Sequence, residues 1–121
     1  MSSKLPLMML PLLVILVCSS AAYSADAAGD WPCLDLKSGQ AKWKDKGVGK
    51  GSVTLADGML YLFSEGGGLA GLATCSPAGL EMKGTFSVAG KGPSWAHPVV
   101  TGDRLYLRYD DNLYCFDVKA K

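Results

Sequence analysis

The sequence has few of the residues that enzymes and metal sites use most. Among its 121 residues there is one histidine, His97, and the four cysteines include no Cys-x-x-Cys pair. A metal site needs several such ligands at short spacing, and none is present. His97 has no second histidine beside it and no nearby Ser or Cys nucleophile in an obvious elbow. We therefore expect His97 to have a structural role before Pro98.

The chain also lacks an excess of charge of either sign. The formal net charge is +1 at pH 7. A near-neutral chain argues against a nucleic-acid partner and against an anionic membrane surface. Lys42, Lys44, Lys46 and Lys50 do cluster, but Asp45 interrupts them and they alternate along an expected strand. We interpret them as a solvated strand face.

One apolar run stands out, and it is too short to cross a membrane. Residues 5–17 are apolar, with Lys4 before them and small residues at 19–22. This order is typical of a secretory signal peptide, whereas a membrane-spanning helix needs about 20 apolar residues. We expect residues 1–24 to be removed, residues 25–30 to be a linker, and the exported protein to be periplasmic or extracellular, with no membrane span.

The cleavage site has two candidates. Small residues precede both Ala25 and Ala28, and the sequence does not choose between them. Cys18 follows the bulky Val17, so lipidation of Cys18 is the less favoured alternative.

Without the signal peptide three cysteines remain: Cys33, Cys75 and Cys115. Export permits disulfides, but an odd count leaves at least one thiol unpaired within the chain. Cys33 and Cys115 occupy the same place in a repeated pattern, where a small apolar side chain would serve equally well. We therefore expect buried free thiols.

That pattern is the stretch "CLDLKSGQAKWK" at residues 33–44, which begins like the chain's last segment, "CFDVKAK". Cys115 and Asp117 occupy the same positions in the pattern as Cys33 and Asp35. Residues 56–72 also align with residues 101–116, at an offset of 44 to 45 positions. A period in the forties is the length of one four-stranded propeller blade.

The pattern within each repeat is that of half-buried strands. Apolar and polar residues alternate, with turn residues between the runs, and no window after the signal peptide shows a sustained helical period. We predict an all-β chain of about two four-stranded antiparallel blades. The expected strands are 52–55, 59–63, 69–74 and 80–88 in the first blade, 99–100, 104–109 and 113–118 in the second, and 31–36 and 40–44 from a preceding blade.

These residues resemble a known family. The spacing of Cys33, Asp35, Ser38, Gly39 and Trp43 is similar to the tryptophan-docking motif of pyrroloquinoline-quinone (PQQ)-like β-propeller repeats. The resemblance covers residues 31–121, and it implies a partial propeller. The family includes quinoprotein dehydrogenases, which resemble one another in a vicinal disulfide, calcium-binding side chains and a catalytic aspartate. The chain has no Cys-Cys pair and too few blades to surround a cofactor, so we expect no catalytic residue and no cofactor, with PQQ and calcium as the alternative.

In this interpretation the motif residues are structural. Asp35 and Ser38 are expected to bond to backbone amides of the turn through Gly39, and Trp43 to cover the seam with the next blade. Trp95 is expected to be a seam residue as well. Residues 110–112 favour a hairpin turn over a calcium site, and residues 66–68 precede no helix, so they do not form a phosphate cradle.

Two blades do not close a ring, which leaves three accounts. The chain is the C-terminal remnant of a longer propeller, the account we favour, or a ring of several copies, or a binding module stabilised by a partner. In the ring, residues 40–44 of one copy complete the 99–118 blade of the next. The leading function is non-enzymatic binding of a protein partner, or self-association through open strand edges. The alternative is a fragment of a PQQ-dependent oxidoreductase.

Overall fold

The computed structural model of the chain describes residues 21–23, 29–76 and 78–120, and for 21–23 it describes the backbone alone. Every regular element in these ranges is a β-strand, and the strands form three antiparallel sheets. The predicted all-β class is confirmed. The remainder of the predicted signal peptide and most of the predicted linker lie outside the described residues. Within those residues no helix is long and apolar enough to cross a bilayer.

The first sheet contains β1 (Ala21–Tyr23), β2 (Trp31–Asp35) and β3 (Ala41–Asp45), in that order. The two strands β2 and β3 are those that the sequence predicts for the end of a blade. The third, β1, was not predicted, and it lies within the predicted signal peptide. It pairs antiparallel with the edge of β2, where Tyr23 stands opposite Cys33. A cut before Ala25 would remove β1 and leave that edge of β2 unpaired.

The middle sheet is a four-stranded meander of β4 (Gly51–Ala56), β5 (Met59–Ser64), β6 (Leu69–Ser76) and β7 (Gly79–Ser87). Its first hairpin turns through Asp57 and Gly58, whose φ angles are 51° and 74°. Positive φ at both central residues is the signature of a type I′ turn, which matches the twist of the flanking strands. The four predicted strands are confirmed, with boundaries shifted by at most two residues.

The third sheet contains β8 (Val99–Thr101), β9 (Arg104–Tyr109) and β10 (Asn112–Asp117). Gly102 and Asp103 repeat the type I′ turn, with φ angles of 56° and 63°. The predicted hairpin at residues 110–112 is the β9–β10 turn. Among the described residues this sheet has three strands, so β10 is an edge, as the missing strand of the second blade predicts.

The last two strands of the first and middle sheets both contain a shift in pairing register, and this shift shows which residues of the two sheets are equivalent. The β2–β3 pairing shifts register between Cys33 and Leu34, and the β6–β7 pairing shifts between Leu72 and Ala73. Just before the shift, Cys33 stands opposite Trp43 in the first sheet, and Leu72 stands opposite Gly84 in the middle sheet. Gly84 is therefore the positional counterpart of Trp43.

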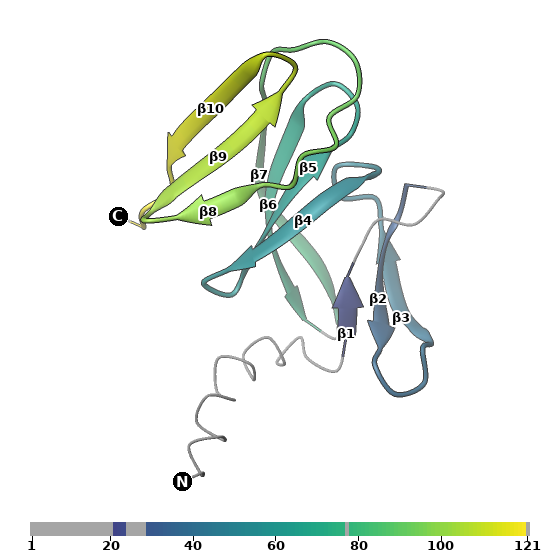
Figure 1. Cartoon of the computed structure of the whole chain (residues 1–121). Helices are drawn as coiled ribbons and strands as arrows, with labels where there is room; N and C mark the ends of the chain where they lie inside the picture. Colours follow the sequence, from purple (N-terminus) through teal and green to yellow (C-terminus); the bar gives the residue numbers. More distant parts are fainter. Residues whose placement is uncertain (1–20, 24–28, 77, 121) are drawn as a thin grey trace, which may run out of the picture.

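The hydrophobic core lies in two parts, one on each face of the middle sheet. The first and third sheets flank the middle sheet on opposite sides, and they do not close into a ring in the described part of the chain (Figure 1). We call the contact between the first and middle sheets the first seam, and the contact between the middle and third sheets the second seam. Trp31, Val48, Leu60, Leu62 and Ala73 are buried in the first seam, and Phe63, Ala70, Val88, Leu105, Leu107 and Tyr109 in the second.

Candidate functional site

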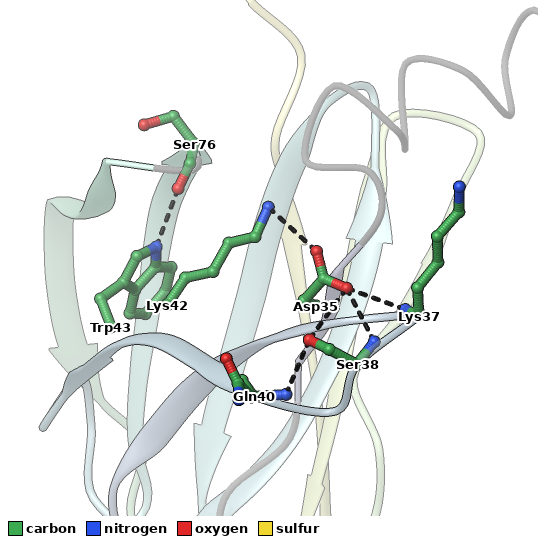
Figure 2. A network of polar contacts seen from close by, with 7 residues as sticks. All are labelled: Asp35, Lys37, Ser38, Gln40, Lys42, Trp43 and Ser76. Carbon is green, nitrogen blue, oxygen red and sulfur yellow. Dashed lines mark hydrogen bonds and ion pairs between the residues drawn. The ribbon is translucent and has the colours of Figure 1, made fainter.

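Trp43 closes the outer end of the first seam. Its side chain is half-buried, and its indole Nε1 donates a hydrogen bond of 2.9 Å to the backbone carbonyl of Ser76 (Figure 2). Ser76 ends β6 of the middle sheet, so the indole from the outer strand of one sheet reaches the next. The predicted seam contact of Trp43 is thus present in the structure.

A second tryptophan anchors the inner part of the same seam. Trp31, at the start of β2, is 2% exposed and packs with the leucines of β5. Its indole N–H donates to the carbonyl oxygen of Gly49 at 2.8 Å, so its one polar group is satisfied. The first seam therefore holds two tryptophans, one buried and one at its rim.

Asp35 organises the turn between β2 and β3. Its Oδ1 accepts hydrogen bonds from the backbone N–H groups of Lys37 and Ser38, both at 2.9 Å, and from the Ser38 hydroxyl at 3.2 Å (Figure 2). The Gly39 N–H donates to the Asp35 carbonyl at 2.8 Å, and Gly39 has a φ of 73°. The motif residues Asp35, Ser38 and Gly39 thus close the hairpin that presents Trp43.

The same contacts stabilise the charged form of Asp35. The backbone N–H of Ser38 lowers the pKa of the Asp35 carboxyl below its ordinary value of 3.8, and that of Lys37 adds to the effect. Lys42 Nζ lies 3.6 Å from Oδ2 and contributes a smaller attraction. The arrangement is a turn clamp, because the carboxylate faces amides of its own loop.

Asp117 repeats part of this clamp at the other end of the chain. Its Oδ1 accepts a hydrogen bond from the Lys119 N–H at 2.9 Å, as Asp35 does from Lys37. The Val118 N–H donates to the carbonyl of Asp103, which ties the segment to the β8–β9 turn. The resemblance between the two aspartates in sequence is therefore also a resemblance in local geometry.

The two cysteines of the repeated pattern have opposite environments, which corrects one prediction. Cys33 is 0% exposed, whereas Cys115 is exposed. Cys33 stands opposite Trp43 and shares its face, which the middle sheet covers. Cys115 faces away from the middle sheet, and no further sheet of the described chain lies against it. Both thiols are free, but the expectation that both are buried is wrong for Cys115.

Trp95 is also placed wrongly by the sequence. It lies in the connection between β7 and β8 and is 75% exposed, so it seals neither seam. The short strand β8 begins only at Val99, four residues further on, and the buried residues of this connection are Val88, Ser94 and Pro98. The neighbouring His97 is exposed as well, and it lines a shallow depression with Trp95 and Glu65.

Tyr109, rather than a tryptophan, occupies the inner part of the second seam. It is 3% exposed, its ring meets Phe63 edge-on at 6.3 Å, and its hydroxyl donates to the Gly92 carbonyl at 2.9 Å. A Cβ on Gly68 would lie 2.2 Å from the Val88 carbonyl oxygen and 2.7 Å from the Tyr109 ring, and the φ of Gly68 is 67°. Glycine is therefore required in the β5–β6 turn so that the tyrosine can fit beneath it.

Hydroxyl groups tie the middle sheet to the connection that leads into β8. Ser52 and Thr54 of β4 donate to the carbonyls of Ala96 and Pro98, at 3.1 and 2.5 Å. The buried Ser94 donates from its backbone N–H to Glu65 and from its hydroxyl to Arg108. The second seam thus has polar tethers along its inner side.

The outer end of the second seam contains a cavity. Its volume is about 270 Å³, and its walls include Leu72, Gly84 and Phe86 of the middle sheet and Leu105, Leu107 and Val118 of the third. Tyr61 also lines it, and burial raises the pKa of the Tyr61 phenol, with the charge of Asp57 raising it further. The cavity lies at Gly84, which is the position of Trp43 in the first seam.

Among the residues that the structure describes, no three His, Cys, Asp or Glu side chains gather in a way that could hold a metal ion. The residues at 110–112 turn between two strands, and those at 66–68 turn between β5 and β6. The structure therefore shows the predicted seam contact of Trp43 and the predicted turn around Asp35, and it adds the seam residues Trp31 and Tyr109 and a cavity, which were not predicted.

Comparison with models of protein families gives no match to this chain. None of the curated proteins compared with it is significantly similar in sequence. The resemblance to PQQ-like repeats therefore stays a prediction that depends on the motif residues.

The cavity, Trp31 and Tyr109 are features that sequence reasoning missed. The strand register needed to place Gly84 opposite Leu72 depends on a bulge, which spacing alone does not reveal. A sequence signal for it does exist, since the segment that follows β6 has no tryptophan where β3 has Trp43.

Proposed function

We propose that the chain is an exported PQQ-like β-propeller repeat protein that acts as a non-enzymatic binding module. Its partner is a protein that presents a β-sheet face, and a second copy of this chain presents such a face in its first sheet. The same proposal holds for a free module and for the C-terminal remnant of a longer propeller. The observation that carries the proposal is the exposure of Cys115, whose counterpart Cys33 is fully covered by the next sheet.

The uncovered face of the third sheet has the composition of a docking surface. Val99, Tyr106 and Cys115 stand side by side across β8, β9 and β10, and Leu113 lies two pairs further along β10, on the same face as Cys115. Val99 and Leu113 are 53% and 67% exposed. Around them are the exposed charged residues Arg104, Arg108 and Asp117. An apolar centre with a charged rim is the common anatomy of a protein interface.

The edge of the third sheet offers a separate contact for self-association, in which a strand extends the sheet instead of covering its face. β10 pairs with β9 on one side, and among the described residues no strand pairs with its other side. An unpaired edge presents backbone donors and acceptors to a strand of another chain. Residues 40–44 of a second copy, which include Trp43, are such a strand. A contact of this kind is head-to-tail, and it gives either a ring or an open chain.

The test is the oligomeric state of the chain without residues 1–24. Size-exclusion chromatography with light scattering should show association that increases with concentration. Leu113→Asp places a charge in the apolar centre and should abolish the association, whereas Trp95→Ser, at an exposed site outside the face, should leave it unchanged. A folded monomer at every concentration would contradict the proposal.

Thiol labelling gives a second readout from the same face. In dilute protein Cys115 should react readily and Cys33 should resist, because only the first is exposed. Labelling of Cys115 should slow at concentrations where the chain associates. Equal rates at all concentrations would show that the face stays open and that the partner does not bind there.

The PQQ-dependent alternative is distinguished by a separate measurement. The described residues supply no set of acidic ligands for the calcium that accompanies PQQ in dehydrogenases of the family. Titration with PQQ and calcium should therefore leave the absorbance spectrum and the melting temperature unchanged. A saturable change would overturn the non-enzymatic proposal.

A further inference from the structure

The cavity at the outer end of the second seam occupies the position that Trp43 fills in the first seam. In the first seam, Trp43 stands opposite Cys33, just before the register shift, and its indole extends to the next sheet. In the second seam, Gly84 stands opposite Leu72 at the same point of the pairing. The same position thus carries the indole of Trp43 in the first sheet and only the hydrogen atom of Gly84 in the middle sheet.

The space at Gly84 is open to a larger group. A Cβ built on Gly84 would have no atom within 4 Å, and its φ lies outside the left-handed region. By contrast, a Cβ on Gly71, on the adjacent strand, would lie 2.6 Å from Met82. The absent side chain at residue 84 therefore accounts for empty space, while other glycines of this sheet allow close packing.

The walls of the cavity favour an uncharged, apolar occupant. They include Leu72, Phe86, Leu105, Leu107 and Val118. Of the described residues that line the cavity, Lys83 alone is charged, and its Nζ is engaged 2.7 Å from Glu81 Oε1. A charged ligand would lose its hydration here without gaining a free partner, which is costly.

We propose that this cavity binds a neutral bicyclic aromatic compound of the indole class. An apolar cavity of about 150 Å³ holds a benzene ring, so a volume of about 270 Å³ fits a ring system of two fused rings. The expected acceptor for the ring N–H follows from the strand pairing. Ala73 pairs with Leu60 as Phe116 pairs with Leu105, so the residue that corresponds to Ser76, three positions after Ala73, is Lys119. Lys119 follows the cavity-lining Val118 in the chain, and we expect its backbone carbonyl to accept the hydrogen bond.

The experiment is a calorimetric titration of the purified chain with indole itself. We expect saturable binding of one indole per chain. Gly84→Trp fills the cavity with a covalent indole and should weaken the binding at least tenfold while raising the melting temperature. Gly66→Trp is the matched control, because residue 66 is equally open but does not line the cavity. It should leave both measurements unchanged.

Three results would overturn the proposal. The first is the absence of saturable heat with the folded chain, and the second is a folded Gly84→Trp variant that binds indole as well as the original. If Gly84→Trp does not fold, Gly84→Leu fills less of the space and the same comparison applies.

The third result concerns a second copy of the chain, which is the competing occupant of the cavity. If association disappears in Gly84→Trp and indole has no effect on the original chain, the cavity is part of a self-association surface. The proposal is then wrong. Association that depends on Leu113 alone leaves the proposed function intact and tests it separately.

Discussion

The two seams of the molecule are built on the same backbone pattern but closed by different residues. In the first seam, Trp43 spans the outer end and hydrogen-bonds to Ser76. In the second seam, the corresponding residue is Gly84, and the large aromatic residue is Tyr109 at the inner end. The register shift that positions both outer strands is nevertheless conserved between the sheets.

This difference shows that strand pairing and seam closure are separable in this chain. Backbone hydrogen bonds set the spacing of the strands whatever side chains they carry, so the repeat persists in both sheets. Seam closure depends on which side chains face the next sheet, and a single residue decides whether the outer end is filled. In the second seam, the hydroxyls of Ser52 and Thr54 donate to carbonyls of the β7–β8 connection, and Ser94 of that connection donates to the carbonyl of Arg108.

The largest effect is expected from removing the aromatic residue of the second seam. Tyr109→Ala should lower the free energy of unfolding by about 3–5 kcal/mol, as loss of a buried aromatic ring does. Tyr109→Phe keeps the ring beneath Gly68 and loses only the hydrogen bond to Gly92, so it should cost about 1 kcal/mol. Chemical denaturation measures both. Equal losses in the two variants would show that the hydroxyl, and not the packed ring, holds this seam.

The corresponding change in the first seam should have a smaller effect. Trp43→Ala should cost about 3 kcal/mol, at the lower end of the range for large aromatic residues, because Trp43 is only half-buried. Trp95→Ala is the control, since its side chain is 75% exposed and should contribute almost nothing. Urea unfolding curves of the two variants that coincide with each other would refute the docking role of Trp43.

A smaller effect still is expected for a polar tether of the second seam. Thr54→Val keeps the shape of the side chain and removes the hydroxyl that donates to Pro98. The expected cost is about 0.5–1.5 kcal/mol, the usual net value of one such hydrogen bond, including the carbonyl left without this donor. Thermal unfolding followed by circular dichroism would detect it. An unchanged melting temperature would indicate that packing alone holds β8 against the middle sheet.

The smallest effect concerns pH and the turn clamp of the first sheet. The pKa of Asp35 is lowered in the folded chain, so its carboxylate stabilises the fold above its ordinary pKa of 3.8, and this contribution is lost as the pH falls through the lowered value. Asp35→Asn should therefore be less stable than the original chain at neutral pH. The difference should begin to shrink below about pH 4 and disappear only below the lowered pKa of the folded chain. Asp111→Asn, in the exposed β9–β10 turn, is the control. A gap that stayed constant down to pH 2 would show that the amide bonds to the turn do not depend on the charge.

Much of the fold was predictable because local chemistry determines it. Alternating apolar residues predicted β5 and β9, and the pairs Asp57-Gly58 and Gly102-Asp103 predicted turns, which the structure shows to have the positive φ angles of type I′. The motif also predicted the amide bonds of Asp35 and the strand that carries Trp43. Each of these depends on residues close together in the chain.

The candidate sites were predicted less well because they depend on contacts between sheets. The sequence predicted that Cys33 and Cys115 are both buried. In the structure only Cys33 is buried, because a neighbouring sheet covers Cys33 and not Cys115. It placed Trp95 in a seam, yet the connection before β8 turns that side chain into solvent and buries Ser94 instead.

The sequence by itself determined the strands from β2 to β10, their turns and the repeat that relates the sheets, since these follow from periodicity and from the preferences of a few residues. The tertiary structure alone decided which repeat positions are covered, that β1 pairs with β2, and that a cavity opens at Gly84. The physical reason is that burial is a property of two surfaces. The strand pattern of a repeat determines the face to which each side chain points. Whether that side chain is buried depends on whether a neighbouring sheet packs against the face.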